Sequence, residues 1–256
     1  MTPLDALYLL LGALTGLLSG LLGVGGGFLL VPALAIGLGW PLVKAVGTSL
    51  MYVAAIGLGG AWTHWRAGNL DGRLVAWLAV PAALLAPLGA ELAVHLPNAW
   101  LALSFSLLLL GVAYSMWRPF RPAEVSDGSE PPRGRAVAWG AVVGVLSGLF
   151  GVGGGLLLVP AQNVALRVPL KRAIGNSLAV VLLTGLVGAI AHLRLGTPNT
   201  HAALPLIAGG MVGVQAGTWW LARLSVPHLR TGLALFLLSL AVVTGARALA
   251  ELGIVP

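Results

Sequence analysis

Long apolar runs alternate with short polar or glycine-rich breaks along the whole chain. The runs lie at about 4–22, 28–39, 45–63, 74–95 and 98–117, and then at about 136–150, 156–166, 173–192, 202–222 and 229–250. Most are long enough for a membrane-spanning helix, which needs ~20 apolar residues. The second run of each set has only about 12 residues, or about 18 Å of helix, roughly half a bilayer. The pattern predicts an all-α membrane protein with two short helices.

Composition supports this prediction. Hydrophobic residues make up 58% of the 256 residues and charged residues only 8%, whereas soluble domains have about 25% charged residues. The apolar residues form continuous runs instead of alternating, which disfavours a transmembrane β-barrel. The absence of cysteine excludes disulfides, thiolate metal sites and cysteine catalysis.

The second half of the sequence repeats the first at a constant offset of 128 residues. Residues 12–32 (GALTGLLSGLLGVGGGFLLVP) and 140–160 (GAVVGVLSGLFGVGGGLLLVP) are identical at 16 of 21 positions. The same offset relates KAVGTSL at 44–50 to RAIGNSL at 172–178. We therefore expect two transmembrane repeats, residues 1–117 and 136–256. They are joined by an exposed linker, residues 118–135, which is rich in proline and charge.

The distribution of the 14 Lys and Arg residues predicts the topology. If each glycine-interrupted pair of runs crosses the membrane once, the two sides carry eight and six basic residues. If each pair enters and returns, the repeats are inverted and the sides carry eleven and three, the three being Lys44, Arg194 and Arg247. The positive-inside rule favours the second arrangement. We expect inverted repeats in the plasma membrane, with the linker cytoplasmic and both termini outside. The net charge of +7 then records orientation and does not indicate a nucleic-acid partner.

The most informative motif is GVGGG, at residues 23–27 and 151–155. Glycine lets a chain leave helical geometry and lets the backbone approach a ligand, and freed backbone groups at membrane depth must be buried or line a cavity. The short helix after each block would point its N–H groups at an anion. We expect the blocks to face each other around a central site, a common plan in secondary transporters, with close helix packing as the alternative. The candidate glycines are Gly25, Gly26, Gly27, Gly153, Gly154 and Gly155. The tandem GxxxG series before each block (Gly12, Gly16, Gly20; Gly140, Gly144, Gly148) predict helix packing faces.

Polar residues near the blocks are further candidates. Ser19 and Ser147 lie four residues before each block, where their hydroxyls reach either a ligand or their own i−4 carbonyl. Gln162 follows the second short helix, where the first has Leu34, and predicts polar lining on that side alone.

Four neutral hydrogen-bonding residues lie near the start of the next run in each repeat. Thr48, Ser49, Asn176 and Ser177 suit sulfonyl or carboxylate oxygens, although helix N-capping is an equal alternative.

Charged and titratable residues sit near the predicted membrane interfaces. Lys44 and Arg172 either attract an anion at each mouth or anchor to lipid headgroups. His64 and His192 end the long runs and are either structural or proton-relaying. No acidic residue falls within a run's centre, which disfavours a carboxylate-based cation carrier. No metal-ligand spacing, catalytic triad or P-loop is found, so we expect neither an enzyme nor a bound cofactor.

The doubled GLLSGLLGVGGGFLLVP block, followed by KAVGTSL and RAIGNSL, resembles the TauE/SafE family of membrane proteins. These are also called sulfite exporters or the toluene-sulfonate uptake permease family. The resemblance spans nearly the whole chain and implies transport of sulfur-containing anions such as sulfite or organosulfonates. The resemblance implies a functional role for both GVGGG blocks and for Thr48, Ser49, Asn176 and Ser177. The family more often has a hydroxyl residue at the position of Asn176.

The leading interpretation is a secondary transporter or facilitator for a small sulfur-containing oxyanion, working by alternating access between two repeats. A passive anion channel and a non-transporting membrane scaffold are the alternatives. Import and export use the same architecture, and the sequence leaves the coupling ion and oligomeric state open.

Overall fold

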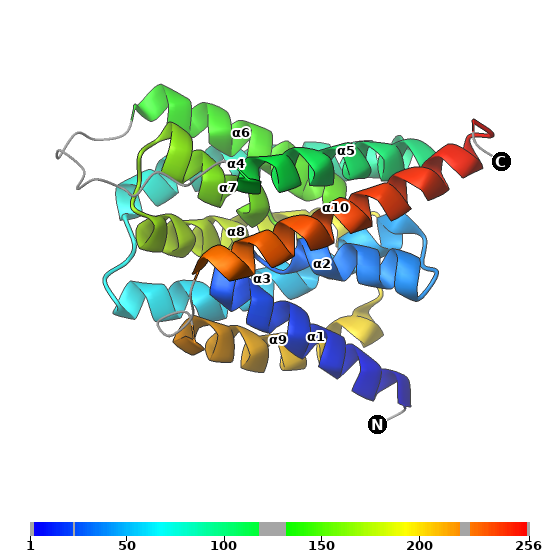
Figure 1. The fold of residues 1–256 in the computed structure, drawn as a ribbon, viewed down its shortest axis with the longest axis horizontal. Coiled ribbons are helices and arrows are strands. Elements are labelled where there is room, and N and C mark those ends of the chain that lie inside the picture. Colours follow the sequence, from blue (N-terminus) through cyan, green and yellow to red (C-terminus); the bar gives the residue numbers. More distant parts are fainter. Residues whose placement is uncertain (1–2, 23, 118–131, 221–225, 255–256) are drawn as a thin grey trace.

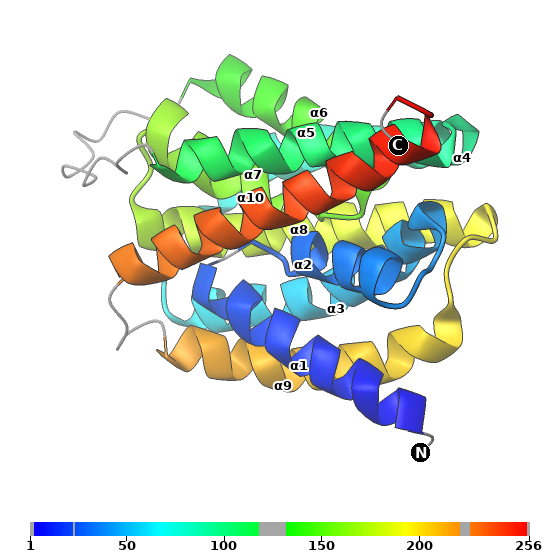
Figure 2. The same ribbon diagram turned by 45° about the vertical axis from the view of Figure 1, so that its right-hand side comes forward.

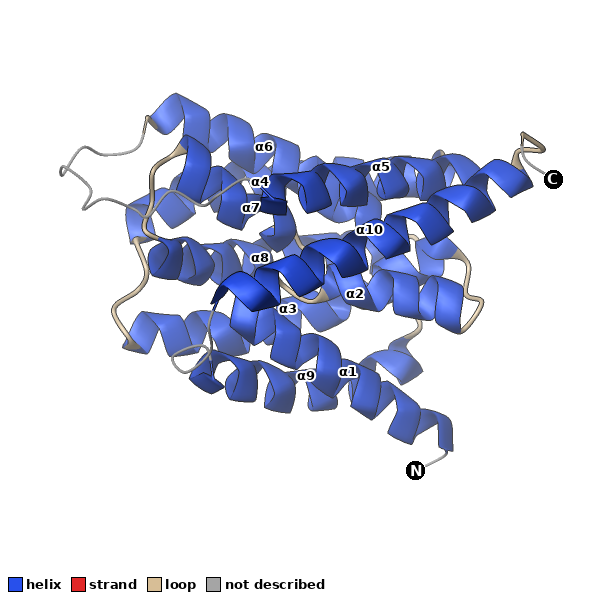
Figure 3. Cartoon of the chain, viewed as in Figure 1, coloured by secondary structure: helices blue, strands red, loops and turns tan. Residues whose placement is uncertain are grey.

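The protein is described here from a computed structural model that covers residues 3–22, 24–117, 132–220 and 226–254. Within these ranges all regular elements are helical (Figure 3). The first half contains α1 (Pro3–Leu22), α2 (Gly27–Pro32), η1 (Ala33–Gly37), α3 (Leu42–Arg66), α4 (Gly72–His95) and α5 (Asn98–Trp117). The second contains α6 (Arg133–Phe150), α7 (Gly155–Pro160), η2 (Ala161–Ala165), α8 (Leu170–Arg194), α9 (Thr200–Trp220) and α10 (Val226–Glu251). The predicted all-α fold is confirmed.

The element bounds lie within three residues of the apolar runs, and one of these differences falls in the linker. Helix α6 begins at Arg133, so residues 133–135, which the sequence assigned to the linker, are helical. Pro132 immediately precedes the helix, and proline is well tolerated at a helix start because its missing N–H would be unpaired there. The rest of the linker lies outside the described residues.

Six helices of the described chain are long and apolar enough to cross a membrane. They comprise Pro3–Leu21, Leu42–Arg66, Gly72–His95, Asn98–Ser115, Leu170–Arg194 and Ala234–Glu251. The most apolar windows of α3 and α8 are 72% and 67% buried, against 33–39% for the other four. Those outer helices expose large apolar side chains such as Leu84, which suits contact with lipid. The chain is a multi-pass membrane protein with α3 and α8 at its centre.

Each main helix pair joins one helix from each half of the chain. Helix α1 packs along α9, α6 along α4, α3 along α8 and α5 along α10 (Figures 1 and 2). At the offset of 128 residues α1 corresponds to α6 and α9 to α4, so the two halves exchange equivalent contacts. Gly16 lies against the backbone of Gly210 on α9, and Gly144 lies against that of Ala82 on α4. The GxxxG series are therefore packing faces, as predicted.

The two ends of the bundle are distinguished by the chain's path. In Figures 1 and 2, α1 begins and α10 ends at the right of the view, which we call the terminal side. Helix α5 ends and α6 begins toward the opposite end, which we call the linker side.

The two short apolar helices have the predicted length. They span Gly27–Gly37 and Gly155–Ala165. Each changes from α- to π-helix directly after a proline, Pro32 or Pro160. Proline lacks the N–H that an α-helical turn would use, so the hydrogen-bond pattern changes there.

Candidate functional site

The two GVGGG blocks lie against each other in the interior. A Cβ added at Gly27 would collide with the carbonyl oxygen of Gly151, and one added at Gly155 would collide with that of Val24. Only residues without a side chain allow these reciprocal contacts. The two blocks thus meet, as predicted, but in the close packing that was the alternative, and a ligand site between them remains a prediction.

The backbone of each block leaves helical geometry through left-handed residues. Gly25 and Gly26 have φ of 83° and 67°, and Gly153 and Gly154 have φ of 69° and 79°. Residues with a Cβ rarely adopt these angles. Gly26 and Gly154 are the N-cap residues of α2 and α7. The predicted breaks thus occur at these glycines.

Hydroxyl groups from the central helices bond to carbonyls in and directly beside the breaks. Ser49 on α3 donates to the Gly151 carbonyl at 2.9 Å. Ser177 on α8 donates to Gly155 at 3.4 Å, and Thr184 donates to Gly153 at 3.0 Å. Ser49 and Ser177 thus support the backbone of the blocks. Thr184 escaped the sequence analysis because its counterpart in the first half is Ile56.

Ser19 and Ser147 are the free hydroxyls beside the blocks. Both side chains are fully buried, and neither hydroxyl oxygen has a hydrogen-bond partner. The alternative of a bond to the i−4 carbonyl is therefore wrong in this state. Buried polar groups are usually paired, so these two are the hydroxyls most available to a ligand.

Thr48 and Asn176 hold the starts of helices in the opposite half. Thr48 Oγ1 accepts from the Asn199 N–H at 2.9 Å, and Asn176 Oδ1 accepts from the Asp71 N–H at 2.8 Å. Asp71 and Asn199 are themselves 128 residues apart, and Asp71 is the N-cap residue of α4. Neither Thr48 nor Asn176 caps its own helix, which Pro41 and Pro169 precede. Both therefore act here as ties between the halves.

Gln162 belongs to a buried amide network and does not line open space. Its Oε1 accepts from Asn176 Nδ2 at 3.1 Å, and its Nε2 donates to the Ala173 carbonyl at 3.3 Å. Asn163 Nδ2 donates to the Val168 carbonyl at 3.1 Å, while its buried Oδ1 is unpartnered. The expectation of polar lining at Gln162 is corrected for this state, because both ends of its amide are occupied.

Tyr52 is a buried polar residue that the sequence analysis missed. Its hydroxyl donates to the Gly12 carbonyl at 3.0 Å and lies 2.7 Å from Thr15 Oγ1. Its ring lies beside Gly26 and Gly210. The feature of the sequence that could have indicated it is an aromatic residue at a position where the second half has Val180.

His64 and His192 differ in their hydrogen bonding. His192 Nε2 lies 3.0 Å from the Gly148 carbonyl and Nδ1 lies 2.8 Å from Thr197 Oγ1, whereas both ring nitrogens of His64 are buried without a partner. His192 thus has the structural role, and a proton relay remains a prediction.

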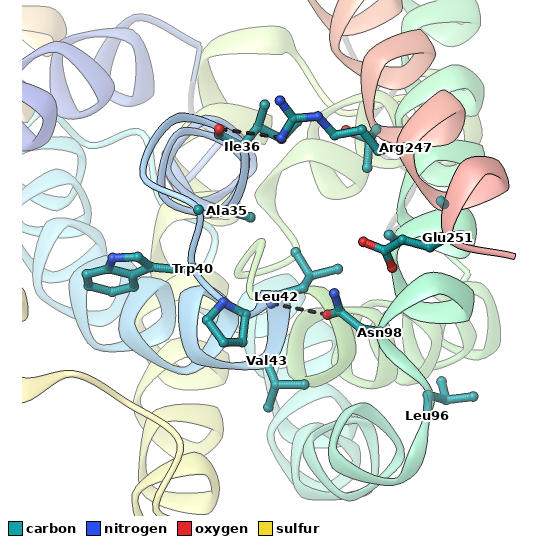
Figure 4. Close-up of a pocket in the computed structure, with 14 residues that line it drawn as sticks. Ala35, Ile36, Trp40, Leu42, Val43, Leu96, Asn98, Arg247 and Glu251 are labelled. Atoms are coloured by element: carbon teal, nitrogen blue, oxygen red, sulfur yellow. Dashed lines mark hydrogen bonds between the residues drawn. The ribbon is translucent and has the colours of Figure 1, made fainter. Parts of the chain in front are cut away.

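A cavity of about 640 Å³ opens at the terminal side, beyond the end of η1 (Figure 4). Arg247 reaches across it toward the Ile36 carbonyl, 3.5 Å from Nη1, and Glu251 lies one turn further along α10. Asn98 on α5 also lines the cavity, and its Oδ1 accepts from the Leu42 N–H at 3.2 Å. This size is typical of small-molecule sites. In the sequence, Arg247 is distinguished only as one of the three basic residues on the less basic side.

Lys44 lies beside this cavity, with its ammonium group 4.9 Å from the centre of the Trp40 ring. Trp40 lines the cavity. The corresponding Arg172 is exposed near the start of α8. Among the residues that the structure describes, no three His, Cys, Asp or Glu side chains gather to hold a metal ion.

Comparison with known proteins identifies the family. The family model described as "Sulfite exporter TauE/SafE" matches residues 8–244. The chain belongs to the TauE/SafE family. It is 33% identical over 219 residues to a probable membrane transporter protein of Xylella fastidiosa, covering 84% of each chain. It is 31% identical over 258 residues to one of Haemophilus influenzae, covering 92% of this chain and 96% of that protein.

An archaeal relative extends this similarity. A probable membrane transporter protein of Methanocaldococcus jannaschii is 28% identical over 246 residues, covering 88% of this chain and 89% of that protein. No solved structure matches the chain. This TauE/SafE protein is thus a membrane transporter, of a family that is not a class of enzymes.

Proposed function

We propose that this TauE/SafE protein moves a small sulfur-containing oxyanion, sulfite or an organosulfonate, across the plasma membrane by alternating access between its two halves. The observation that carries the proposal is the meeting of the GVGGG blocks, each at the start of a short helix inside the molecule. Helix starts favour anions through their free N–H groups. The buried and unpaired hydroxyls of Ser19 and Ser147 add neutral donors beside the blocks. The description of the matching family supports the class of substrate.

The proposed topology is an inverted repeat with the linker in the cytoplasm and both termini outside. It is supported by the basic residues, eleven against three. It is also supported by the end of α5 and the start of α6, which lie toward the end of the bundle opposite α1's start and α10's end (Figure 1). The cavity with Arg247 would then be the outer mouth. A reporter fused to either terminus should be accessible only from outside, and a cytoplasmic terminus would overturn the topology.

The functional test is anion flux in proteoliposomes containing the purified full chain. Sulfite, thiosulfate, sulfoacetate and sulfate are offered in turn. We expect saturable flux of at least one sulfur oxyanion above that of protein-free vesicles. Electrically measured, non-saturating current would favour a channel. No flux of any of the four would contradict the proposal and favour a scaffold.

A further inference from the structure

His64 and His192 occupy corresponding positions near the ends of α3 and α8, yet their rings are bonded differently. His192 is fully buried and uses both ring nitrogens, toward Thr197 and the Gly148 carbonyl. His64 is only 4% exposed, and neither ring nitrogen has a partner. A buried imidazole without partners is unfavourable, so this difference between two equivalent residues requires a reason.

The backbone around the two histidines does not supply that reason. The Asn69 N–H donates to the His64 carbonyl at 2.9 Å, and the corresponding Thr197 N–H donates to the His192 carbonyl at 3.2 Å. A glycine of the facing helix packs on each histidine, Gly175 on His64 and Gly47 on His192. The local backbone is thus the same. Asn69 stands where Thr197 contacts His192 Nδ1, which accounts for that one contact, and the missing Nε2 contact of His64 is left to be explained.

The bond from His192 ties α6 to α8. Gly148 lies within the last four residues of α6, where carbonyls have no partner inside the helix. Gly20 is the corresponding residue of α1, which ends at Leu22 and leaves a carbonyl of the same kind. The bond between His192 and the Gly148 carbonyl is thus present, whereas the corresponding bond between His64 and the Gly20 carbonyl is absent.

We propose that His64 and His192 are positioning residues that tie the two sides of the transporter alternately. In the state described, His192 holds α6 against α8, while His64 is released from α1. In the opposite-facing state His64 donates to the Gly20 carbonyl and His192 leaves Gly148. The inference rests on the proposed alternating access, because two related halves that exchange conformations would also exchange these two bonds.

The chain offers a matched pair of variants to test this. His192→Leu removes the tie of the described state, and His64→Leu removes the tie of the opposite state. The net contribution of one hydrogen bond corresponds to a shift on the order of two- to tenfold in the equilibrium between states. The two variants should shift it in opposite directions, which a merely structural role for either histidine would not produce.

The readout uses the absence of cysteine from the native sequence. Ser19→Cys and Ser147→Cys place single thiols next to Gly20 and Gly148, at two side chains that are equally buried. The rates of reaction with N-ethylmaleimide are measured on the full-length protein in detergent, by mass spectrometry. We expect His192→Leu to speed labelling at 147 and slow it at 19, and His64→Leu to do the reverse.

Shifts in the same direction, or no shift, would overturn the proposal. If either leucine variant does not fold, the glutamine variants at the same positions replace the pair. A glutamine amide can still donate to the glycine carbonyl, so those shifts should be smaller and still opposite, and any other pattern overturns the proposal. Opposite shifts, together with no sulfur-anion flux in the native protein without introduced cysteines, would refute the proposed substrate and support the ties. Normal flux with an unchanged labelling ratio would refute the ties alone.

Discussion

The two halves of the molecule share one backbone plan and differ in the polar groups attached to it. The π-helical turn of the first short helix packs Leu34 and Ala35 against apolar neighbours, whereas that of the second holds Gln162 and Asn163 in a buried amide network. The first half instead places Tyr52 beneath its glycine block, where the second has Val180. The comparison shows that glycines and apolar runs are sufficient to repeat the fold, while the hydrogen bonds diverge within it.

The largest effect is expected where the halves are alike. Gly27→Val and Gly155→Val each put a side chain onto the carbonyl of the opposite block, and overpacking of this kind costs about 1–3 kcal/mol or more. Each variant should melt at a lower temperature in detergent and lose most anion flux. Gly111→Ala is the control, because no atom lies within 4 Å of its added Cβ. Full flux in both valine variants would remove the blocks from the mechanism.

The next largest effect is a loss of stability, which should differ between the halves. Asn176→Leu leaves the Asp71 N–H and Gln162 Oε1 without partners, whereas Thr48→Val leaves only the Asn199 N–H. A buried group left unpaired costs about 1–3 kcal/mol. Thermal unfolding in detergent should therefore show a larger loss for Asn176→Leu. Equal losses of stability would mean that the amide network does not stabilise the second half.

A smaller effect concerns the cavity at the terminal side, which carries opposite charges on neighbouring turns of α10. Arg247→Gln should lower the rate of anion flux several-fold at low ionic strength, because it removes an attractive charge. Glu251→Gln should raise it, because a repulsive charge is lost. Both differences should shrink at 1 M salt, where the Debye length is about 3 Å. Flux assays at two salt concentrations decide this, and equal changes in both variants would contradict an electrostatic role.

The smallest effect is expected at Asn163, where the first half has Ala35. Asn163→Ala loses the bond to the Val168 carbonyl but also removes the buried, unpartnered Oδ1. These terms oppose each other, so the change in unfolding free energy should stay below about 1 kcal/mol. A larger loss, measured by thermal unfolding, would show that Oδ1 has a partner after all.

Much of the fold could be predicted from the pattern of residues. The runs at 98–117 and 74–95 became α5 and α4 within two residues, and the short runs became the short helices, because helix length follows from continuous apolar sequence. The contact between the blocks also followed, since glycine readily adopts left-handed φ and has no side chain to keep a carbonyl away.

The roles of the polar candidates could not be predicted in the same way. Ser49 and Ser19 look alike in sequence, yet Ser49 is bonded to Gly151 and Ser19 has no partner. Thr48 was a candidate for binding the substrate, yet its hydroxyl accepts a hydrogen bond from the backbone of Asn199 instead. Tyr52 was missed because an aromatic residue in an apolar run gives no sign of what its hydroxyl reaches.

The sequence by itself determined the helical class, the duplication, the short helices and the place of the breaks, because these depend on residues close together in the chain. Only the tertiary structure decided which hydroxyls are free and which histidine is tied. A hydrogen bond requires its two atoms within about 3 Å, and Ser49 and Gly151 lie 102 residues apart in sequence. Such distances are set by how the two halves pack together.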